Sequence, residues 1–186
     1  MKIMDFLRKG SLVIGIVAMV LLVTGTLIEG GSLLQKILFL FGAPMLAFTA
    51  YLNKQRMFMI IQIIVTIGSI LAFFTNLPDF LRYSIMVGGG FFGIGYLIKI
   101  KYSKEDIWWP LGGLGLLSIA VGFATNAVAH QLLFNSLLAI GGILVAIYSA
   151  IGFFHLKVRI AFIWLVLNVI FSISPLLIIL SHLVTI

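Results

Sequence analysis

The chain has 186 residues, of which 62% are hydrophobic and only 9% are charged, and its mean hydropathy is +1.26. Soluble domains are typically about 45–50% apolar with roughly 25% charged residues, so this composition excludes an ordinary soluble domain and predicts an all-α integral membrane protein. The absence of cysteine excludes disulfides and thiolate metal sites.

Charged residues and turn motifs divide the chain into seven apolar segments. A membrane-spanning helix needs about 20 mostly apolar residues, and we predict spans at about 11–28, 34–52, 57–76, 79–98, 107–126, 132–153 and 159–182. Turns are predicted at LIEGGS (27–32), TNLPD (75–79) and KYSKED (101–106), which contain glycine, proline or clustered polar residues. Trp108 and Trp109 are expected at one membrane face, and Pro110 in the first turn of its helix.

The first apolar segment also fits a secretory signal peptide, because Lys2, Arg8 and Lys9 precede it. No A-x-A-like cleavage site follows this segment, which favours a retained first helix.

Positive charge is divided unequally between the two sides that these spans define. The net charge of +7 is therefore interpreted as loop charge and not as a nucleic-acid surface. Only Lys36 and Arg82 fall on one side, whereas the other holds Lys2, Arg8, Lys9, Lys54, Arg56, Lys99, Lys101, Lys104, Lys157 and Arg159. Cytoplasmic loops carry the excess of Lys and Arg. We predict a multi-pass protein of the cell inner (plasma) membrane, with a cytoplasmic N-terminus and an external C-terminus.

Short matches between distant segments predict an internal repeat. FFTN (73–76) recurs as FATN (123–126), fifty residues later. A second match, at an offset of about 100, aligns Arg56 with Arg159 and Ser69 with Ser172, and it pairs the first three predicted helices with the last three. We therefore predict one membrane domain, 1–186, with seven helices in a 3+1+3 arrangement. Repeat 1 covers about 11–76, a linker helix about 79–98 and repeat 2 about 107–182. In transporters built this way the site lies near the midplane, where the repeats meet.

This layout resembles that of the SWEET sugar carriers, the PnuC-type nicotinamide riboside transporters and the small bacterial inner-membrane family typified by YgjV. DIWWPLGG (106–113) is similar to the N-x-W-x-W-P-F-G stretch of PnuC-type proteins. It departs from that stretch because Asp106 replaces Asn, Trp108 and Trp109 are adjacent, and Leu111 replaces Phe. A Pro-Gln pair of the SWEET kind is absent. The resemblance implies a carrier of a vitamin- or nucleoside-like solute.

Glycine-rich segments predict close helix packing. GGGFFG (88–93) satisfies G-x-G-x-x-G, but it lies inside a span and not between a strand and a helix, which excludes a dinucleotide site. Gly89 and Gly93 form a GxxxG motif, and with Gly88, Gly90 and Gly95 they are expected to let another helix approach closely. The same role is expected of Gly112, Gly113, Gly115, Gly141 and Gly142, and these faces leave homo-oligomerisation open.

No Asp, Glu, Lys or Arg lies deep within any predicted span, and His130, His155 and His182 fall near span ends. Proton-driven pumps use such buried groups, and a membrane enzyme needs a base, a nucleophile or metal ligands. The sequence therefore predicts no enzyme, no catalytic residue, no cofactor and no metal site.

Uncharged polar residues form two columns at four-residue spacing, which places them on one helix face. One column contains Trp164, Asn168 and Ser172, continued by Pro175, and the other contains Phe58, Gln62, Thr66 and Ser69. The candidate solute-binding residues are Gln62, Thr66, Ser69, Asn135, Trp164, Asn168 and Ser172. Trp164 is expected to stack on a planar solute, and the amides and hydroxyls to bind its polar groups. The alternative role for each is a hydrogen bond between helices, contributing roughly 0.6 kcal/mol.

These observations predict a carrier of a small polar solute that works by facilitated diffusion, with the solute and the lipid bilayer as its partners and no nucleic acid. Coupling to protons needs a titratable group deep within a span, and the predicted spans offer none. Sodium stays open, because Pro44 and Pro175 free carbonyls within their helices. The alternative is a non-transporting membrane protein, such as the substrate-binding subunit of a larger complex.

Overall fold

The structure, a computed structural model, describes residues 2–28, 32–74, 76–100, 106–125 and 130–184, with side chains from Gly10 onward. This part of the chain forms seven α-helices and no strand, which confirms the predicted all-α fold and the helix count. The helices are α1 (Lys2–Leu27), α2 (Leu33–Leu52), α3 (Arg56–Leu71), α4 (Asp79–Lys99), α5 (Trp109–Ala124), α6 (Gln131–Ala150) and α7 (Ala161–Val184). A π-helical turn, η2 (Ile151–His155), continues α6.

Some predicted features lie outside the described residues. These are residues 29–31 and 101–105 of the predicted turns, Thr75 and Asn126 of the FFTN and FATN motifs, and the side chains of Lys2, Arg8, Lys9, Lys101 and Lys104.

Five helices are long and apolar enough to cross a membrane, whereas α3 and α5 have only 16 residues each. The predicted ends at 76 and 126 are therefore too far along the chain. After Leu71 the amides of Phe73 and Phe74 bond three residues back, which ends the α-helical pattern. Thr125 is extended, with φ −71° and ψ 135°, and ends α5. A 16-residue helix measures about 24 Å, less than the roughly 30 Å of a bilayer core.

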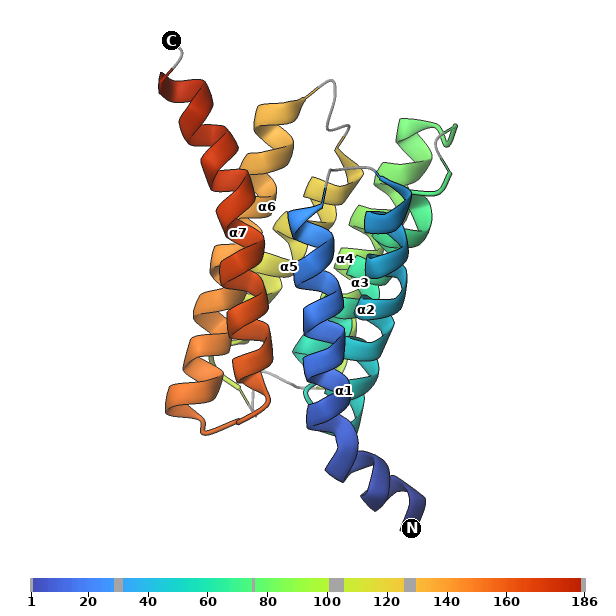
Figure 1. The fold of residues 1–186 in the computed structure, drawn as a ribbon, viewed down its shortest axis with the longest axis vertical. Helices are drawn as coiled ribbons and strands as arrows, with labels where there is room; N and C mark the ends of the chain where they lie inside the picture. Colours follow the sequence, from blue (N-terminus) through green and yellow to red (C-terminus); the bar gives the residue numbers. More distant parts are fainter. Residues whose placement is uncertain (1, 29–31, 75, 101–105, 126–129, 185–186) are drawn as a thin grey trace.

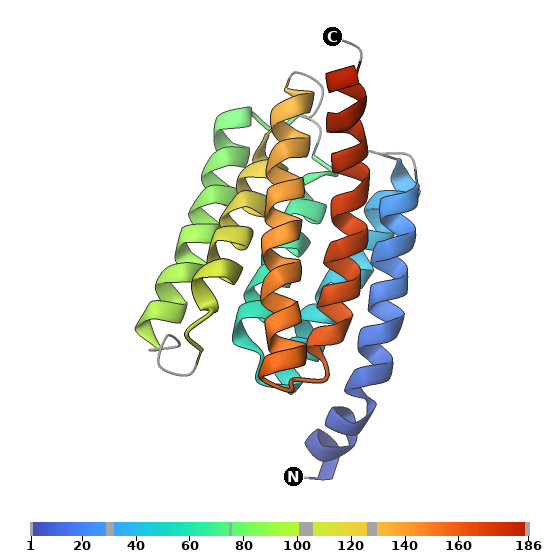
Figure 2. The same cartoon turned by 90° about the vertical axis from the view of Figure 1, so that its left-hand side faces the viewer.

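Six of the helices form a closed ring. Contacts run in the order α1, α2, α3, α5, α6 and α7, and α7 returns to α1. Helix α4 lies outside the ring and packs on α3 and α5 (Figure 2). The N- and C-termini lie at opposite ends of the bundle (Figure 1), as an odd number of passes requires.

One end of the bundle carries most of the described positive charge. The C-terminal ends of α2, α4 and η2 lie at the same end as the N-terminus (Figure 2). We call this the basic end, and its described cationic residues are Lys54, Arg56, Lys99, Lys157 and Arg159. Lys36 and Arg82 belong to the opposite end.

The turns that precede α3 and α7 share a rare backbone conformation. Lys54 and Lys157 both adopt left-handed φ angles, 59° and 57°. Each lysine stands two residues before an arginine, Arg56 or Arg159, and these are the two arginines that the sequence alignment matched. Non-glycine residues seldom adopt this conformation, which glycine usually supplies where a helix ends. The two turns therefore share an uncommon backbone conformation at the same distance from the matched arginines.

Glycines allow the helices to pack closely, as predicted. A Cβ on Gly115 would lie 3.0 Å from the Gly141 carbonyl oxygen, and a Cβ on Gly141 would lie 3.0 Å from the Gly115 carbonyl oxygen. Helices α5 and α6 therefore cross backbone to backbone. A Cβ on Gly93 would lie 2.5 Å from Ile60 on α3. Neighbouring atoms also lie within 4 Å of a Cβ built on Gly89, Gly90, Gly112, Gly113 or Gly142. A Cβ on Gly88 or Gly95 would meet no described atom within 4 Å, so the close approach predicted at these two glycines is wrong within the described chain.

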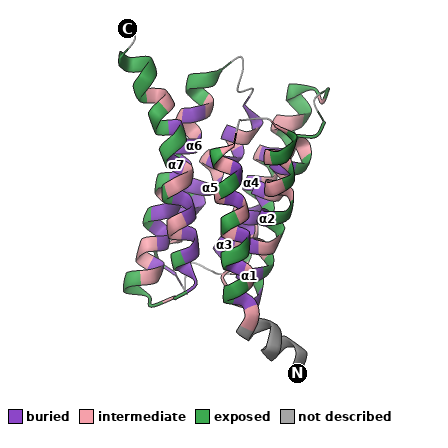
Figure 3. Ribbon diagram, viewed as in Figure 1, coloured by how far each residue is buried: buried purple, intermediate pink, exposed green. Residues whose placement is uncertain are grey.

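Burial is concentrated between the helices, and outward-facing surface such as the upper part of α7 is exposed (Figure 3). Large apolar side chains cover this outer surface, among them Phe80, Phe92 and Leu177, which are 81%, 80% and 61% exposed. Soluble monomers rarely expose apolar surface on this scale, so the surface suits contact with lipid.

Candidate functional site

Three aromatic side chains close the interior of the ring near the basic end. Phe58 lies in the first turn of α3 and Trp164 in the first turn of α7, and their rings stack with centroids 4.6 Å apart and planes 21° apart. Tyr148, near the end of α6, contacts Phe58 at 5.3 Å and 50°. All three side chains are buried, Trp164 completely. We call Phe58, Tyr148 and Trp164 the aromatic plug.

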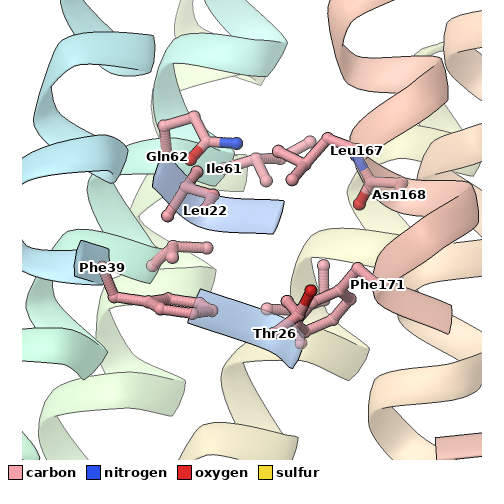
Figure 4. A pocket seen from close by; sticks show the side chains of 10 residues that line it. Leu22, Thr26, Phe39, Ile61, Gln62, Leu167, Asn168 and Phe171 are labelled. Carbon is pink, nitrogen blue, oxygen red and sulfur yellow. The ribbon is translucent and has the colours of Figure 1, made fainter. Parts of the chain in front are cut away.

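A small cavity lies one helical turn beyond the plug, toward the opposite end, and Figure 4 shows the side chains that line it. Gln62 lies one helical turn beyond Phe58, and Asn168 one turn beyond Trp164, so stacking of the two rings places the two amides around the same space, about 6 Å further in. The lining residues are Leu22, Thr26, Phe39, Ile61, Gln62, Val65, Ile119, Leu167, Asn168 and Phe171. The cavity of about 30 Å³ holds about two waters, whereas solute pockets typically measure about 300–1,000 Å³.

The two amides differ in how their polar atoms are satisfied. Asn168 Nδ2 donates to the Trp164 carbonyl at 2.8 Å. Gln62 Oε1 is buried and finds no hydrogen-bond donor among the described residues, although the side chain is only 2% exposed. A buried acceptor without a donor is destabilising by about 1–3 kcal/mol, so this oxygen is a position where a solute or a water would gain a hydrogen bond.

The remaining candidate residues lie outside this cavity lining. Four of them hydrogen-bond the backbone of their own helix four residues back, at 2.7–2.8 Å, and these are Thr66, Ser69, Asn135 and Ser172. These four bonds run within one helix, whereas the alternative role predicted from the sequence is a hydrogen bond between helices. Ser172 also packs closely on Gly142 of α6.

Trp164, predicted to stack on a solute, stacks on Phe58 in this conformation. Its Nε1 is buried and has no acceptor among the described residues. One face of the indole is thus covered by Phe58, while the indole N–H remains without a partner in the described part of the chain.

A groove opens between α1 and α7 on the side of the cavity away from the basic end. Its volume is about 470 Å³, and its lining is Thr26, Leu27, Ile170, Ile173, Ser174, Leu177, Ile178 and Ser181. Thr26 lines both the groove and the internal cavity. Figure 4 shows Thr26 with Phe39 and Phe171 on one side of the cavity, and Leu22, Gln62 and Asn168 on the other.

Two features of this region have little signal in the sequence. Thr26 is a single hydroxyl with no column of polar residues on its helix, so only its position between cavity and groove reveals it. Asp106 stands in a predicted turn, yet its side chain is only 7% exposed. Its Oδ2 accepts a hydrogen bond from the Tyr148 hydroxyl at 2.5 Å.

The chain matches no protein-family model, no curated protein and no solved structure.

Proposed function

We propose that this protein is a membrane carrier for a small, uncharged polar solute, possessing one central site and working by facilitated diffusion. The observation that carries the proposal is the meeting of Gln62 and Asn168 at one internal cavity. The two amides come from α3 and α7, and the Gln62 oxygen is buried without a donor among the described residues. A buried polar acceptor without a donor is destabilising, so its presence at a cavity is best explained by a ligand that binds it.

Membrane insertion is supported by five helices of sufficient length and by the apolar outer surface. The shorter α3 and α5 each touch three neighbouring helices, which shields much of their surface from lipid. The charge division between the two ends favours a cytoplasmic basic end. We therefore place the protein in the plasma (inner) membrane, with the basic end inside and the C-terminus outside.

The 3+1+3 repeat is supported by the helix contacts. Exchanging α1 with α5, α2 with α6 and α3 with α7 reproduces every contact of the six-helix ring. The left-handed turns at Lys54 and Lys157 are also exchanged by this operation. The cavity is lined from both halves, by α1, α2 and α3 and by α5 and α7. This is where carriers built from repeats bind their solutes.

The chemistry around the cavity selects the solute class. Two amides offer both donors and acceptors, and the remaining lining is apolar or aromatic apart from Thr26. The lining contains no charged residue among those described, so an ionic solute would lose its hydration without gaining a counter-charge. A neutral solute with an apolar or aromatic face and a few N–H or O–H groups fits best, and nucleoside-like or vitamin-like molecules belong to this class.

Access to the cavity differs between the two ends. The aromatic plug closes the basic end, while the α1–α7 groove meets the cavity at Thr26. Helix α4 covers the α3–α5 junction, the other place where the two halves meet, so the α1–α7 junction is the uncovered one. In the proposed transport cycle this conformation precedes entry of solute from the groove, and the cavity must widen to accept it.

Binding tests the proposal directly. Purified protein is screened by thermal shift against neutral nucleosides, ribosides, sugars and amides, with the matching phosphorylated compounds as charged controls. We expect a neutral compound to raise the melting temperature and its phosphorylated form to have no effect. Stabilisation by charged compounds alone would contradict the assigned solute class.

A further inference from the structure

A buried carboxylate borders the aromatic plug. Asp106 directly precedes the turn into α5, and its side chain is 7% exposed, whereas Asp79 at the start of α4 is exposed. Both carboxylate oxygens of Asp106 are used. Oδ1 accepts the backbone N–H of Trp108 at 2.8 Å, and Oδ2 accepts the hydroxyl of Tyr148 at 2.5 Å. The first bond fixes the carboxylate to the start of α5, and the second ties it to the end of α6.

The second bond acts on the plug through Tyr148. The ring of Tyr148 contacts Phe58, and Phe58 stacks on Trp164, so one chain of contacts links Asp106 to α7. Gly112 leaves the room this position of Tyr148 needs, because a Cβ there would lie 3.2 Å from Tyr148 Cδ1. The start of α5 therefore both anchors Tyr148 and accommodates its ring.

We propose that Asp106 is a positioning residue of the carrier, which holds the plug closed through Tyr148 and loses this hydrogen bond when the basic end opens. This inference rests on the proposed function, because only a carrier has to open both ends in turn. Hydrogen bonds to carboxylates are among the stronger ones in proteins, and a buried site excludes the water that would otherwise compete for the hydroxyl. The bond therefore biases the protein toward the conformation closed at the basic end.

Side-specific accessibility of a cavity residue tests this role without knowledge of the solute. The parent protein carries Ile61→Cys, which places one thiol on the cavity lining of a chain that has no native cysteine. An impermeant thiol reagent is added to membrane vesicles from the basic side. Tyr148→Phe keeps the ring and removes the hydroxyl, and we expect it to raise the labelling rate about tenfold or more, the change that loss of one such bond implies.

Tyr96→Phe is the matched control. The Tyr96 hydroxyl accepts a hydrogen bond from Arg56 Nη1 at 2.7 Å, near the same end but outside the plug. We expect its labelling rate to equal that of the parent. Equal rates for the parent, Tyr148→Phe and Tyr96→Phe would overturn the proposal.

A second variant keeps the test decisive if one protein folds poorly. Asp106→Asn weakens the same bond from its other side, so the double variant with Tyr148→Phe should label no faster than the faster single variant. Multiplication of the two single effects would show that the residues act independently and would overturn the pairing. If the variants label faster but the protein transports no solute, the role of Asp106 at the plug stands and the proposed carrier function is rejected. If the protein transports solute but the variants label at the parent rate, only the role of Asp106 is rejected.

Discussion

Phe58 and Trp164 stack on each other from opposite halves of the chain, with ring centroids 4.6 Å apart. This contact aligns the first turns of α3 and α7, and the next turn of each helix then brings Gln62 and Asn168 to one cavity. The stack also fills the face of Trp164 that a planar solute would use. In the proposed carrier the site and the closure of the basic end are coupled, because separating the two rings would open that end and uncover the indole together.

Gln62→Leu should separate binding from stability. The leucine removes a buried acceptor that lacks a donor among the described residues, so the melting temperature should stay unchanged or rise. A bound solute would lose one hydrogen bond, about 1–3 kcal/mol, and affinity should fall roughly 5- to 150-fold. Thermal unfolding gives the melting temperature, and titration calorimetry with the solute found by thermal shift gives the affinity of the same preparation.

Asn168→Leu should weaken binding to a similar extent, and Asn135→Leu is its matched control. Both asparagines are buried and donate to a backbone carbonyl four residues back, but only Asn168 lines the cavity. Affinity should therefore fall in the first variant and persist in the second. Equal losses in the two variants would mean that the amides maintain helix geometry and that the solute binds elsewhere.

The left-handed lysines predict matched stabilisation by glycine. Lys54 and Lys157 hold φ angles of 59° and 57°, a conformation that disfavours residues with a Cβ by roughly 1–2 kcal/mol. Lys54→Gly and Lys157→Gly should each stabilise the protein by about 0.5–1 kcal/mol after the entropy of glycine is subtracted. Lys54→Ala and Lys157→Ala control for the lost charge and should show no gain. Opposite signs for the two glycine variants would contradict the likeness of the two turns.

Glycine substitutions should distinguish packed faces from open ones. Gly115→Ala brings a methyl group within about 3 Å of the Gly141 carbonyl and of Val145 on α6, contacts that backbone atoms cannot relieve cheaply. We expect a loss of about 1–3 kcal/mol. Gly95→Ala on α4 meets no atom within 4 Å and should leave stability unchanged or slightly higher. Unfolding in detergent, followed by circular dichroism, compares the two, and similar melting temperatures would contradict the packing of α5 on α6.

Orientation can be read with single cysteines because the native chain has none. In intact cells Ser103→Cys should be shielded from an impermeant thiol reagent, and Gly30→Cys should react. The charge division between the two sides motivates this expectation. The reverse pattern would place the basic end outside and would exchange the direction assigned to the plug and the groove.

Much of the fold follows from patterns that sequence records directly. Apolar length gives the seven helices, and charge gives the turns between them. The ends of α3 and α5 were harder to predict, because FFTN and FATN are apolar enough to extend a helix and only the local turn bonds end it. Four-residue spacing correctly predicts that Gln62 lies one turn from Phe58 on the same face of α3, and Asn168 one turn from Trp164 on the same face of α7.

The parts of the site that sequence does not reveal depend on contacts between distant segments. Spacing cannot tell that Trp164 packs on Phe58, nor that Ser172 and Thr66 bond to their own helices. Asp106 is polar and lies beside a turn, so its pattern is that of a solvated residue. Its burial follows from the meeting of the α5 start with Tyr148, 42 residues away.

Transport by the purified protein in liposomes tests the central claim most directly. A facilitated-diffusion carrier equilibrates its solute, so internal solute should rise to the external concentration and stop there. Imposed pH or sodium gradients should leave this final level unchanged, because the described cavity lining contains no titratable group. Uptake should also saturate and should fall in Asn168→Leu. Liposomes that contain folded, solute-binding protein and yet show no uptake above empty liposomes would contradict the account, and accumulation driven by either gradient would contradict its mechanism.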